Sequence, residues 1–508
     1  MTLTQKTRKP IYKIGHCCQV APTNEGRKLP TTPSQSQTSR FIAAVGAYAP
    51  LLRLERAAAA KALTFSGLGG RPSGRRAVAG WDEDALTLAV EASRALPQPE
   101  AVTFASTSAP FIERSQATLL VDALALDPSV RTGDVAGSRR CAVSALRDAL
   151  LGRGDTLIAA GEKRPATAGS SQHLFDGDGG AAAFVSDRGA AQLLGHASLS
   201  HDLVDLYASP ERPQSYAYEE RFVRDTAIGK VIAPTIKAAC AAAGVAPSEI
   251  ARAAVHEPLA GCWREISRLT GVTAPNIAAD LAQAVGDLGA AHALFAFAVA
   301  CAGARKGDLV LLAGFGSGCD AMVFRLTGEM PGAREAAALL SKGVAFDDYM
   351  RFLSLTGAVQ LDWGVRSEFE QKAQATVLER YGRDMIGFVG GRDADGNVQF
   401  PKSRIPVRPG ATMPEQLEDV RLADCAARIV SVTADRLNFT PDPPFWFGLV
   451  QFDNGARVMM EFTDGDGRGF SVGDAVRPLL RIKSRDARRG FRTYFWKAAP
   501  ADRPTIEG

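Results

Sequence analysis

The sequence predicts an α/β domain built from two similar halves, followed by a small all-β barrel. From Arg40 to about Gly328, short apolar runs alternate with amphipathic helical patterns. The run GDTLIAAG at 154–161 recurs as GDLVLLAG at 307–314, which indicates a duplicated unit, with chance similarity of two buried strands as the alternative. From about Asp419 to Pro500, short runs alternate apolar and polar residues between turns, which favours a small closed barrel.

The individual elements follow from the spacing of apolar residues. Short apolar runs bounded by turn residues predict strands at 41–50, 101–106, 155–162, 181–186, 251–258, 308–314 and 321–326. Apolar residues that recur every three or four positions predict helices at 83–96, 141–152, 233–244 and 289–304. The DNGA stretch at 453–456 predicts a hairpin in the barrel.

Changes in composition divide the chain into six segments. Residues 1–39 are basic, poor in acidic residues and rich in Thr, Pro, Ser and Gln, so we expect a disordered tail. Residues 40–187 and 188–330 are the expected halves of the α/β domain, and 331–384 read as a helical connector. Residues 385–412 are rich in Gly, Pro and Arg and predict loops with short hairpins, and 413–508 form the expected barrel.

Composition excludes several classes of protein. Of 508 residues, 46% are hydrophobic and 22% charged, which is ordinary for a globular protein rather than a disordered or fibrous one. The net charge of +4 is too small for a protein whose affinity rests on nucleic-acid phosphates. Eight cysteines form no C-x-x-C pair, and no apolar run reaches about 18 residues. We therefore expect a reduced cytoplasmic protein without a membrane or nucleic-acid partner.

Cys141 is a candidate nucleophile. It follows the turn AGSRR and begins the predicted helix CAVSALRDALL. A helix N-terminus favours the thiolate, and Arg139 and Arg140 add positive potential. The alternative is a small buried apolar residue, as most free cysteines are.

Two further positions could complete a site. His256 ends the strand ARAAV and is followed by Glu257 and Pro258, so it lies where sites form in α/β sheets, although a structural histidine is the alternative. The loop from Gly314 to Gly318 can bring backbone amides to an oxyanion, and it lacks the Lys-Ser/Thr of a phosphate-binding loop.

Five motifs in this order resemble the thiolase superfamily, and within it the archaeal type of hydroxymethylglutaryl-CoA synthase. They are AAVGAYAP, AVAGWDEDALTLAVEASRAL, RRCAVSAL, VHEP and GDLVLLAGFGSGCDA, and the likeness covers about residues 40–365. The resemblance implies a duplicated thiolase-like fold in layers αβαβα. It also implies that Cys141 takes an acyl group from CoA, that His256 holds or deprotonates the second substrate, and that amides of Cys141 and of Gly316, Ser317 and Gly318 polarise the thioester.

Two departures from the family pattern affect the expected chemistry. The family glutamate of a Glu-Ser-x-Pro motif is replaced by Thr107 in Ser106-Thr107-Ser108-Ala109-Pro110, and a threonine cannot act as a general base. Asp287 stands where the family has an asparagine. Asp287 either supplies the missing carboxylate or only caps a helix, and both interpretations stay open.

The C-terminal part resembles the zinc-ribbon and OB-fold module that accompanies thiolase-like acyltransferases. TPDPPFWFGLVQFDNGARVMMEFTD and RTYFWKAAP carry this resemblance. The ribbon keeps Phe400-Pro401, but Arg392, Asp395, Pro406 and Pro409 stand where its cysteines would be, so no zinc is expected. An OB-fold alone would suggest single-stranded nucleic acid, but its fusion partner favours packing on the thiolase-like domain or guiding an acyl-CoA tail.

The sequence therefore predicts a CoA-dependent acyltransferase that uses a CoA thioester as substrate and no tightly bound cofactor. The proposed catalytic residues are Cys141, His256 and Asp287. A retro-aldol lyase acting on a β-hydroxyacyl-CoA and a non-catalytic scaffold subunit of a thiolase complex are the alternatives. The resemblance also implies a homodimer, or a larger thiolase complex.

Overall fold

A nine-stranded mixed sheet forms the centre of the structure, a computed structural model that describes residues 40–66, 72–217, 219–359, 361, 375–411, 416–438, 440–486 and 489–505. The predicted tail at 1–39 lies outside the described residues. The strand order is β11-β12-β13-β8-β1-β7-β6-β4-β5. The strands are β1 (Phe41–Tyr48), β4 (Ala101–Ala105), β5 (Arg131–Val135), β6 (Thr156–Glu162), β7 (Gly179–Ser186), β8 (Ala191–Ser200), β11 (Ile250–Val255), β12 (Leu309–Phe315) and β13 (Gly318–Leu326).

The sheet repeats one arrangement of four strands. Within the first half, β1 pairs antiparallel with β7, β7 antiparallel with β6, and β6 parallel with β4. Within the second half, β8 pairs antiparallel with β13, β13 antiparallel with β12, and β12 parallel with β11. The two echoed sequence runs are the equivalent strands β6 and β12. The shared topology supports a duplicated unit.

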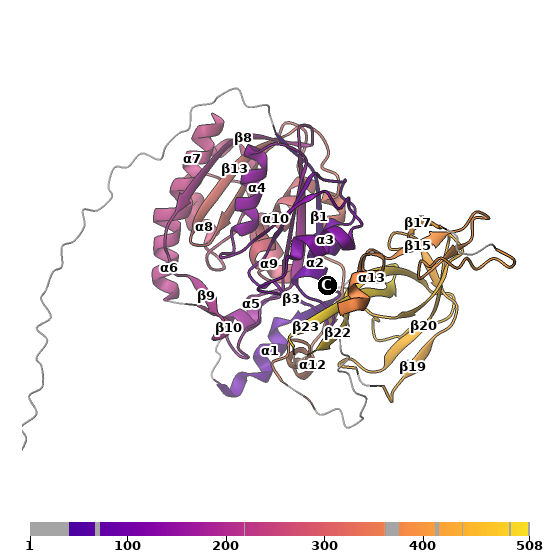
Figure 1. Ribbon diagram of the computed structural model, residues 1–508. Helices are drawn as coiled ribbons and strands as arrows, with labels where there is room; N and C mark the ends of the chain where they lie inside the picture. Colours follow the sequence, from indigo (N-terminus) through magenta and orange to yellow (C-terminus); the bar gives the residue numbers. More distant parts are fainter. Residues whose placement is uncertain are drawn as a thin grey trace, which may run out of the picture. The chain divides into compact units, whose positions relative to one another are not determined.

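Helices lie on both outer faces of the α/β part, and two further helices lie between its two halves (Figure 1). The helices α2 (Ala85–Ser93) and α3 (Gln116–Ala123) pack on the first half, and α7 (Ala233–Ala243) and α8 (Trp263–Thr270) belong to the core of the second. Between them lie α4 (Cys141–Leu151) and α10 (His292–Ala302), whose buried residues share one core with strands of both halves. This order of layers agrees with the expected αβαβα arrangement.

Glycines bring α2 unusually close to the sheet. A Cβ atom on Gly46, Gly161 or Gly180 would lie 1.9–2.2 Å from a carbonyl oxygen of α2. Asp84 fixes the start of this helix through a capping box with Thr87. The end of β6, where Glu162 follows Gly161, is therefore held tightly beneath α2.

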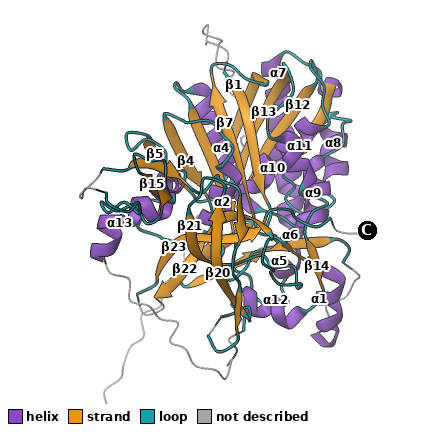
Figure 2. Ribbon diagram, turned by 90° about the vertical axis from the view of Figure 1, so that its right-hand side faces the viewer, coloured by secondary structure: helices purple, strands orange, loops and turns teal. Residues whose placement is uncertain are grey.

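The remaining elements of the α/β part surround this sheet. They are β2 (Leu52–Glu55), α1 (Arg56–Ala62), η1 (Thr64–Ser66), β3 (Arg75–Val78), α5 (Ser171–Phe175), β9 (Leu206–Ser209), β10 (Arg212–Ala217), α6 (Glu220–Thr226), η2 (Ala227–Ile232), η3 (Pro247–Glu249), α9 (Ile277–Val285) and η4 (Gly289–Ala291). The predicted helical connector contains α11 (Ala333–Ala338), β14 (Val344–Phe346), α12 (Tyr349–Leu355) and α13 (Ala375–Gly387). Strand β14 joins β2 and β3 in a small sheet, so the connector is not purely helical (Figure 2).

One helical run is long and apolar enough to cross a membrane by length and composition. It spans Glu220–Ala243, and 56% of its most apolar window is buried inside the protein. Its last part, α7, packs against β8 and β13. This burial is what a core helix of the second half would show.

The C-terminal part consists of two antiparallel sheets. The first has the order β16-β15-β17, from Val398–Gln399, Val389–Arg392 and Glu418–Arg421. The second has the order β19-β20-β18-β22-β23, with β21 on β20. Its strands are β18 (Ala427–Ile429), β19 (Thr433–Asp435), β20 (Phe445–Phe452), β21 (Arg457–Glu461), β22 (Ala475–Asp486) and β23 (Phe491–Pro500). An isolated bridge, Phe462 to Ala498, links the residue after β21 to β23, but the expected closed barrel is not confirmed.

Acidic residues before α2 bind the C-terminal strands β22 and β23. The segment Trp81–Asp84 belongs to the motif WDED, and its three carboxylates are almost fully buried. The ion pairs are Asp82–Lys497 at 2.9 Å, Glu83–Arg481 at 3.0 Å and Asp84–Arg492 at 2.8 Å. The amide of Ile482 also donates to the carbonyl of Asp82 at 2.8 Å. The α/β part and the C-terminal sheet are thus joined by buried, paired charges.

Arg408 links two turns of the segment at 385–411 through ion pairs. Arg408 lies 3.9 Å from the carboxylate of Asp393 and 3.6 Å from that of Asp395. Asp393 also accepts hydrogen bonds from Asn397. Among the described residues no group of three or more metal-ligating side chains occurs. These ion pairs connect the turns at 392–395 and 406–409, where the sequence resemblance would place zinc ligands.

Candidate active site

Cys141 begins α4 and its side chain is almost fully buried, at 3% exposure. Burial raises the pKa of its thiol to about 12, and the nearby Glu162 carboxylate contributes, while backbone amides at Cys141, Ala142 and Ser106 act in the opposite direction. The expected thiolate is therefore not favoured in the free protein. The sulfur does lie where the ends of β4 and β6 meet the start of α4.

Glu162 is a buried carboxylate that the sequence did not single out. Its oxygens accept hydrogen bonds from the Thr107 amide at 2.7 Å, the Thr107 hydroxyl at 2.9 Å, the Ser108 hydroxyl at 2.6 Å and the Ala290 amide at 3.2 Å. Burial raises its pKa above the ordinary value, although Arg164 and the donors at Ser108 and Thr107 lower it. A carboxylate thus stands directly behind Thr107, the position of the family glutamate.

His256 and Asp287 form a pair, as their positions in the sequence allowed. His256 follows β11, and its Nε2 lies 3.1 Å from both carboxylate oxygens of Asp287. Asp287 also accepts a hydrogen bond from the amide of Gly289 at 2.8 Å, so it caps the turn η4 and contacts the histidine at the same time. The two interpretations of Asp287 are therefore compatible.

Two arginines neutralise Asp287. Arg139 donates to Asp287 at 3.1 Å and to Asp205 at 2.5 Å. Arg164 lies 3.5 Å from Asp287 and 3.1 Å from Asp176. Burial opposes ionisation of Asp287, but the charges of His256, Arg164 and Arg139 hold its pKa well below its usual range. Arg139 was expected to act on the Cys141 thiol and instead serves this carboxylate.

The two carboxylates of the site have opposite tendencies. Cations hold the pKa of Asp287 well below its usual range, whereas burial raises the pKa of Glu162 despite the charge of Arg164 and the donors at Ser108 and Thr107. Adjacent amides of one turn, Gly289 and Ala290, bind one carboxylate each. Environments that shift the pKa values of two carboxylates in opposite directions suit one carboxylate to proton transfer and keep the other permanently charged.

The glycine loop between β12 and β13 lies against the turn that precedes Cys141. Gly316, Ser317 and Gly318 all have positive φ angles, and a Cβ atom on Gly316 would lie 3.1 Å from the amide nitrogen of Arg139. The Gly316 amide donates to the Gly318 carbonyl at 3.0 Å, and the Cys141 amide donates to the Ser138 carbonyl at 3.0 Å. An oxyanion would have to compete with these two acceptors.

A cavity of about 280 Å³ opens onto the histidine side of the site. His256, Asp287, Arg139 and Asp205 lie on its wall, together with residues of α5, α6 and α9. Neither Cys141 nor Glu162 is among the residues that line it. The cavity, called the His256 cavity below, therefore ends at the His256–Asp287 pair.

Glu162 could have been found from the internal repeat. The runs GDTLIAAGE and GDLVLLAGF are equivalent, so Glu162 occupies the position of Phe315 in the second copy. A carboxylate at the end of a buried strand, where the repeat has an aromatic ring, is a signal of function. The positions of Asp176 and Asp205 gave no such signal.

Comparison with known proteins relates this chain to acyl-CoA enzymes. No protein-family model matches the sequence. The hydroxymethylglutaryl-CoA synthase of Aeropyrum pernix is 27% identical over 316 residues, covering 58% of this chain and 84% of that protein. The enzyme of the same name from Pyrococcus furiosus is 24% identical over 303 residues, covering 56% and 85%.

Solved structures agree on the fold. A hydroxymethylglutaryl-CoA synthase complexed with CoA superposes with a TM-score of 0.54 at 16% identity, covering 66% of this chain and 95% of that one. The synthase of the curacin pathway, in complex with an acetyl donor carrier protein, gives 0.53 at 19% identity, covering 64% and 92%. The fold is thiolase-like. With the sequence relatives, these neighbours point to an acyltransferase similar to hydroxymethylglutaryl-CoA synthases.

Proposed function

We propose that this protein is a CoA-dependent acyltransferase that forms an acyl thioester on Cys141 and then makes or cleaves a carbon–carbon bond. The observation that carries the proposal is the position of Cys141 at the start of α4, beside the buried Glu162 and within a turn of Arg139, which holds the His256–Asp287 pair. Relatives named hydroxymethylglutaryl-CoA synthase support this reaction class.

The first step is transfer of the acyl group to sulfur. The Cys141 sulfur attacks the carbonyl carbon of an acyl-CoA, the bond to the CoA sulfur breaks, and the thiol proton ends on the released CoA. A thiol with a pKa of about 12 must lose its proton as it attacks rather than before. Bound substrate and the amides around the sulfur would stabilise the charge that develops.

The second step needs a base for an α-carbon, and Glu162 is the residue we assign to it. In condensation the carboxylate removes a proton from the α-carbon of the second acyl-CoA, and the carbanion attacks the thioester carbonyl on Cys141. The bond to the Cys141 sulfur then breaks, a β-ketoacyl-CoA leaves, and the sulfur recovers its proton from Glu162. A hydrogen bond from His256, which Asp287 orients across 3.1 Å, stabilises the oxyanion of the tetrahedral intermediate. The reverse direction is thiolytic cleavage by CoA.

Covalent labelling tests the first step. Protein mixed with acetyl-CoA and longer acyl-CoA donors is expected to gain one acyl mass on the peptide that contains Cys141, and Cys141→Ala should gain none. Cys301→Ala is a matched control, because Cys301 is equally buried but lies at the end of α10. Absence of an adduct with every donor, or an adduct that survives Cys141→Ala, contradicts the proposal.

A retro-aldol lyase acting on a β-hydroxyacyl-CoA is the second candidate, and one observation favours it. The His256 cavity reaches His256 and Asp287 but not Cys141, whose thiol is buried and protonated. A retro-aldol reaction needs a base for the hydroxyl and no cysteine thioester. It predicts that Cys141→Ala keeps its activity and that His256→Gln loses it, the reverse of the dependence on Cys141 in the first proposal.

We also propose that the C-terminal part is a metal-free zinc-ribbon and OB-fold module, and that the protein is a cytoplasmic homodimer. The three-stranded and six-stranded sheets support the module. Strand β5 supports the dimer, because it ends the main sheet and four of its five residues are exposed. Neither a nucleic acid nor a membrane is required by this function.

A further inference from the structure

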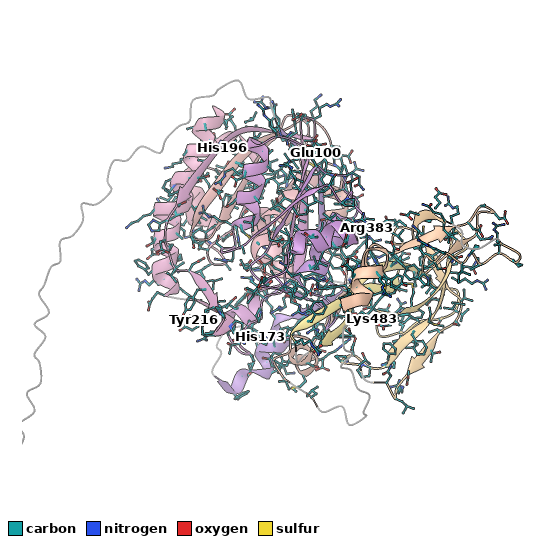
Figure 3. All side chains as sticks on the ribbon, viewed as in Figure 1. Glu100, His173, His196, Tyr216, Arg383 and Lys483 are labelled. Carbon is teal, nitrogen blue, oxygen red and sulfur yellow. The ribbon has the colours of Figure 1, made fainter. Side chains whose placement is uncertain are left out.

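A second cavity lies between the α/β part and the C-terminal sheet. Its volume is about 620 Å³, larger than that of the His256 cavity. Residues from both parts line it, among them Trp81, Thr107, Lys163, Arg485 and Arg492. His173 of α5, labelled in Figure 3, is also on its wall. We call it the junction cavity.

Two cations of the junction cavity form no ion pair within 4.0 Å among the described residues, although the carboxylates of Glu83, Asp84 and Asp178 also lie on its wall. Lys163 donates to the carbonyl oxygens of Gly80 at 2.6 Å and Glu83 at 3.1 Å. Arg485 donates to the carbonyl oxygen of Trp81. Both side chains are half-buried. By contrast, the neighbouring Arg492 is paired with Asp84 at 2.8 Å, so its charge is balanced.

The two cations repel each other. Burial, with a smaller contribution from the charge of Arg485, lowers the pKa of Lys163 to about 8, while the carboxylates of Asp178, Glu83 and Asp84 act in the opposite direction. Burial also lowers the pKa of Arg485, with Arg492 as the second cause. Half-buried cations in this state are stabilised by any anion that enters between them.

The rest of the wall limits what such an anion can be. Trp81, Pro110, Leu355 and Pro213 provide apolar surface, which suits the body of an organic molecule rather than a bare ion. At one end stand Thr107 and Ser108, whose hydroxyls contact Glu162. The junction cavity therefore reaches the hydroxyls that bind Glu162, whereas His256 lies on the wall of the other cavity.

We propose that the junction cavity binds an anionic group carried on an apolar body, and that Lys163 and Arg485 hold the anion. The anionic oxygens come either from a carboxylate at the end of an acyl chain or from a phosphate of CoA. Because Arg485 lies on β22, the C-terminal part would supply one of the two binding charges. This site goes beyond the proposed function, since it requires no reaction at Cys141.

Titration calorimetry on the full chain tests the site with hexanoate, hexanamide and inorganic phosphate as probes. Binding of hexanoate is expected, without binding of the neutral hexanamide, and both Lys163→Gln and Arg485→Gln should weaken it at least tenfold. Arg485→Lys should restore most of the affinity. Lys483→Gln is the matched control, because Lys483 lies two residues away on β22, is exposed, pairs with Glu461 and does not line the cavity (Figure 3).

The outcomes separate the sources of the anion and the two proposals. Hexanoate binding alone assigns the site to an acyl carboxylate, and phosphate binding alone assigns it to CoA. Failure of both anions, equal binding of hexanamide, or no loss in Arg485→Gln overturns the proposal. Because neither cation makes an ion pair within the described part of the chain, Lys163→Gln and Arg485→Gln should unfold at about the temperature of the wild type, and a thermal melt of each variant checks that weakened binding does not come from misfolding. Cys141→Ala should bind unchanged, so failure of acyl transfer leaves this test intact.

Discussion

Replacing Glu162 by glutamine removes one charge from the site and little else. Glutamine keeps the size of the side chain and an oxygen that can accept from the Thr107 and Ala290 amides, which lie 2.7 and 3.2 Å from the present carboxylate. Its amide group can donate to the Ser108 hydroxyl, which now donates to Glu162. We therefore expect Glu162→Gln to fold with its hydrogen bonds largely preserved.

The charge, however, acts on two reactions. Glu162 is the second cause, after burial, of the raised pKa of Cys141, so its removal should lower that pKa. A like charge a few ångströms away is typically worth about one pKa unit or more, which means about tenfold more thiolate at any pH well below the pKa. Loss of a general base typically reduces the rate of carbon–carbon bond formation by about 10²–10⁴.

The two effects have opposite signs, and that separates them from general damage. Alkylation of Cys141 by iodoacetamide at pH 9 should become faster in Glu162→Gln, while turnover of an acyl-CoA pair into a condensed product should fall. Glu100→Gln is the control, because Glu100 is exposed and immediately precedes β4 (Figure 3). Slower alkylation of Cys141, or unchanged condensation, would refute the assignment of Glu162.

Three further changes test the charges around the site and the segment at 385–411. Asp287→Asn leaves Arg139 and Arg164 short of a partner and should lower the free energy of unfolding by about 3 kcal/mol in urea titration at pH 7. Because the folded pKa of Asp287 is held low, this stabilisation exists above pH ~4 and fades as the pH falls through the folded pKa; a constant difference would contradict it. Burial lowers the pKa of His173 to about 4, so wild-type stability should fall as the pH drops from ~6.5 towards 4, and less so in His173→Gln. Arg408→Gln should speed amide exchange at residues 393–397, whereas a zinc chelator should leave exchange unchanged.

The parts of the site that could be predicted are those set by local pattern. Cys141 follows a turn and begins a helix, and His256 directly follows the strand β11, so each signal lies within a few neighbouring residues. Glu162 could not be placed in the same way. Its contact with Thr107 depends on the parallel register of β4 and β6, which pairs Ala105 with Ala160. The strand order that brings them together is a property of the whole sheet.

The same distinction explains the two strands of the nine-stranded sheet that the sequence analysis did not predict. Strand β5 reads RTGDV and is mostly exposed, so it has no apolar pattern, and it is set by pairing with β4 at the edge of the sheet. Strand β8 reads AQLLGHASLS, where polar residues and Gly195 break the apolar run. Gly195 is needed because a Cβ atom there would lie 2.3 Å from the backbone of α7. The close packing of α7 therefore requires a glycine at the position where an apolar side chain would have indicated the strand.

The acidic motif before α2 connects the fold to the function. Its carboxylates are buried against cations of β22 and β23. Because burying an unpaired charge costs several kcal/mol, removal of either the carboxylates or the cations should destabilise the contact between the two parts. The same docking brings Arg485 within hydrogen-bond reach of Trp81, next to Lys163. A shift of the C-terminal sheet would therefore change the junction cavity and the surroundings of Thr107 at once. We therefore expect a displaced C-terminal sheet to weaken ligand binding at the proposed junction-cavity site through the position of Arg485.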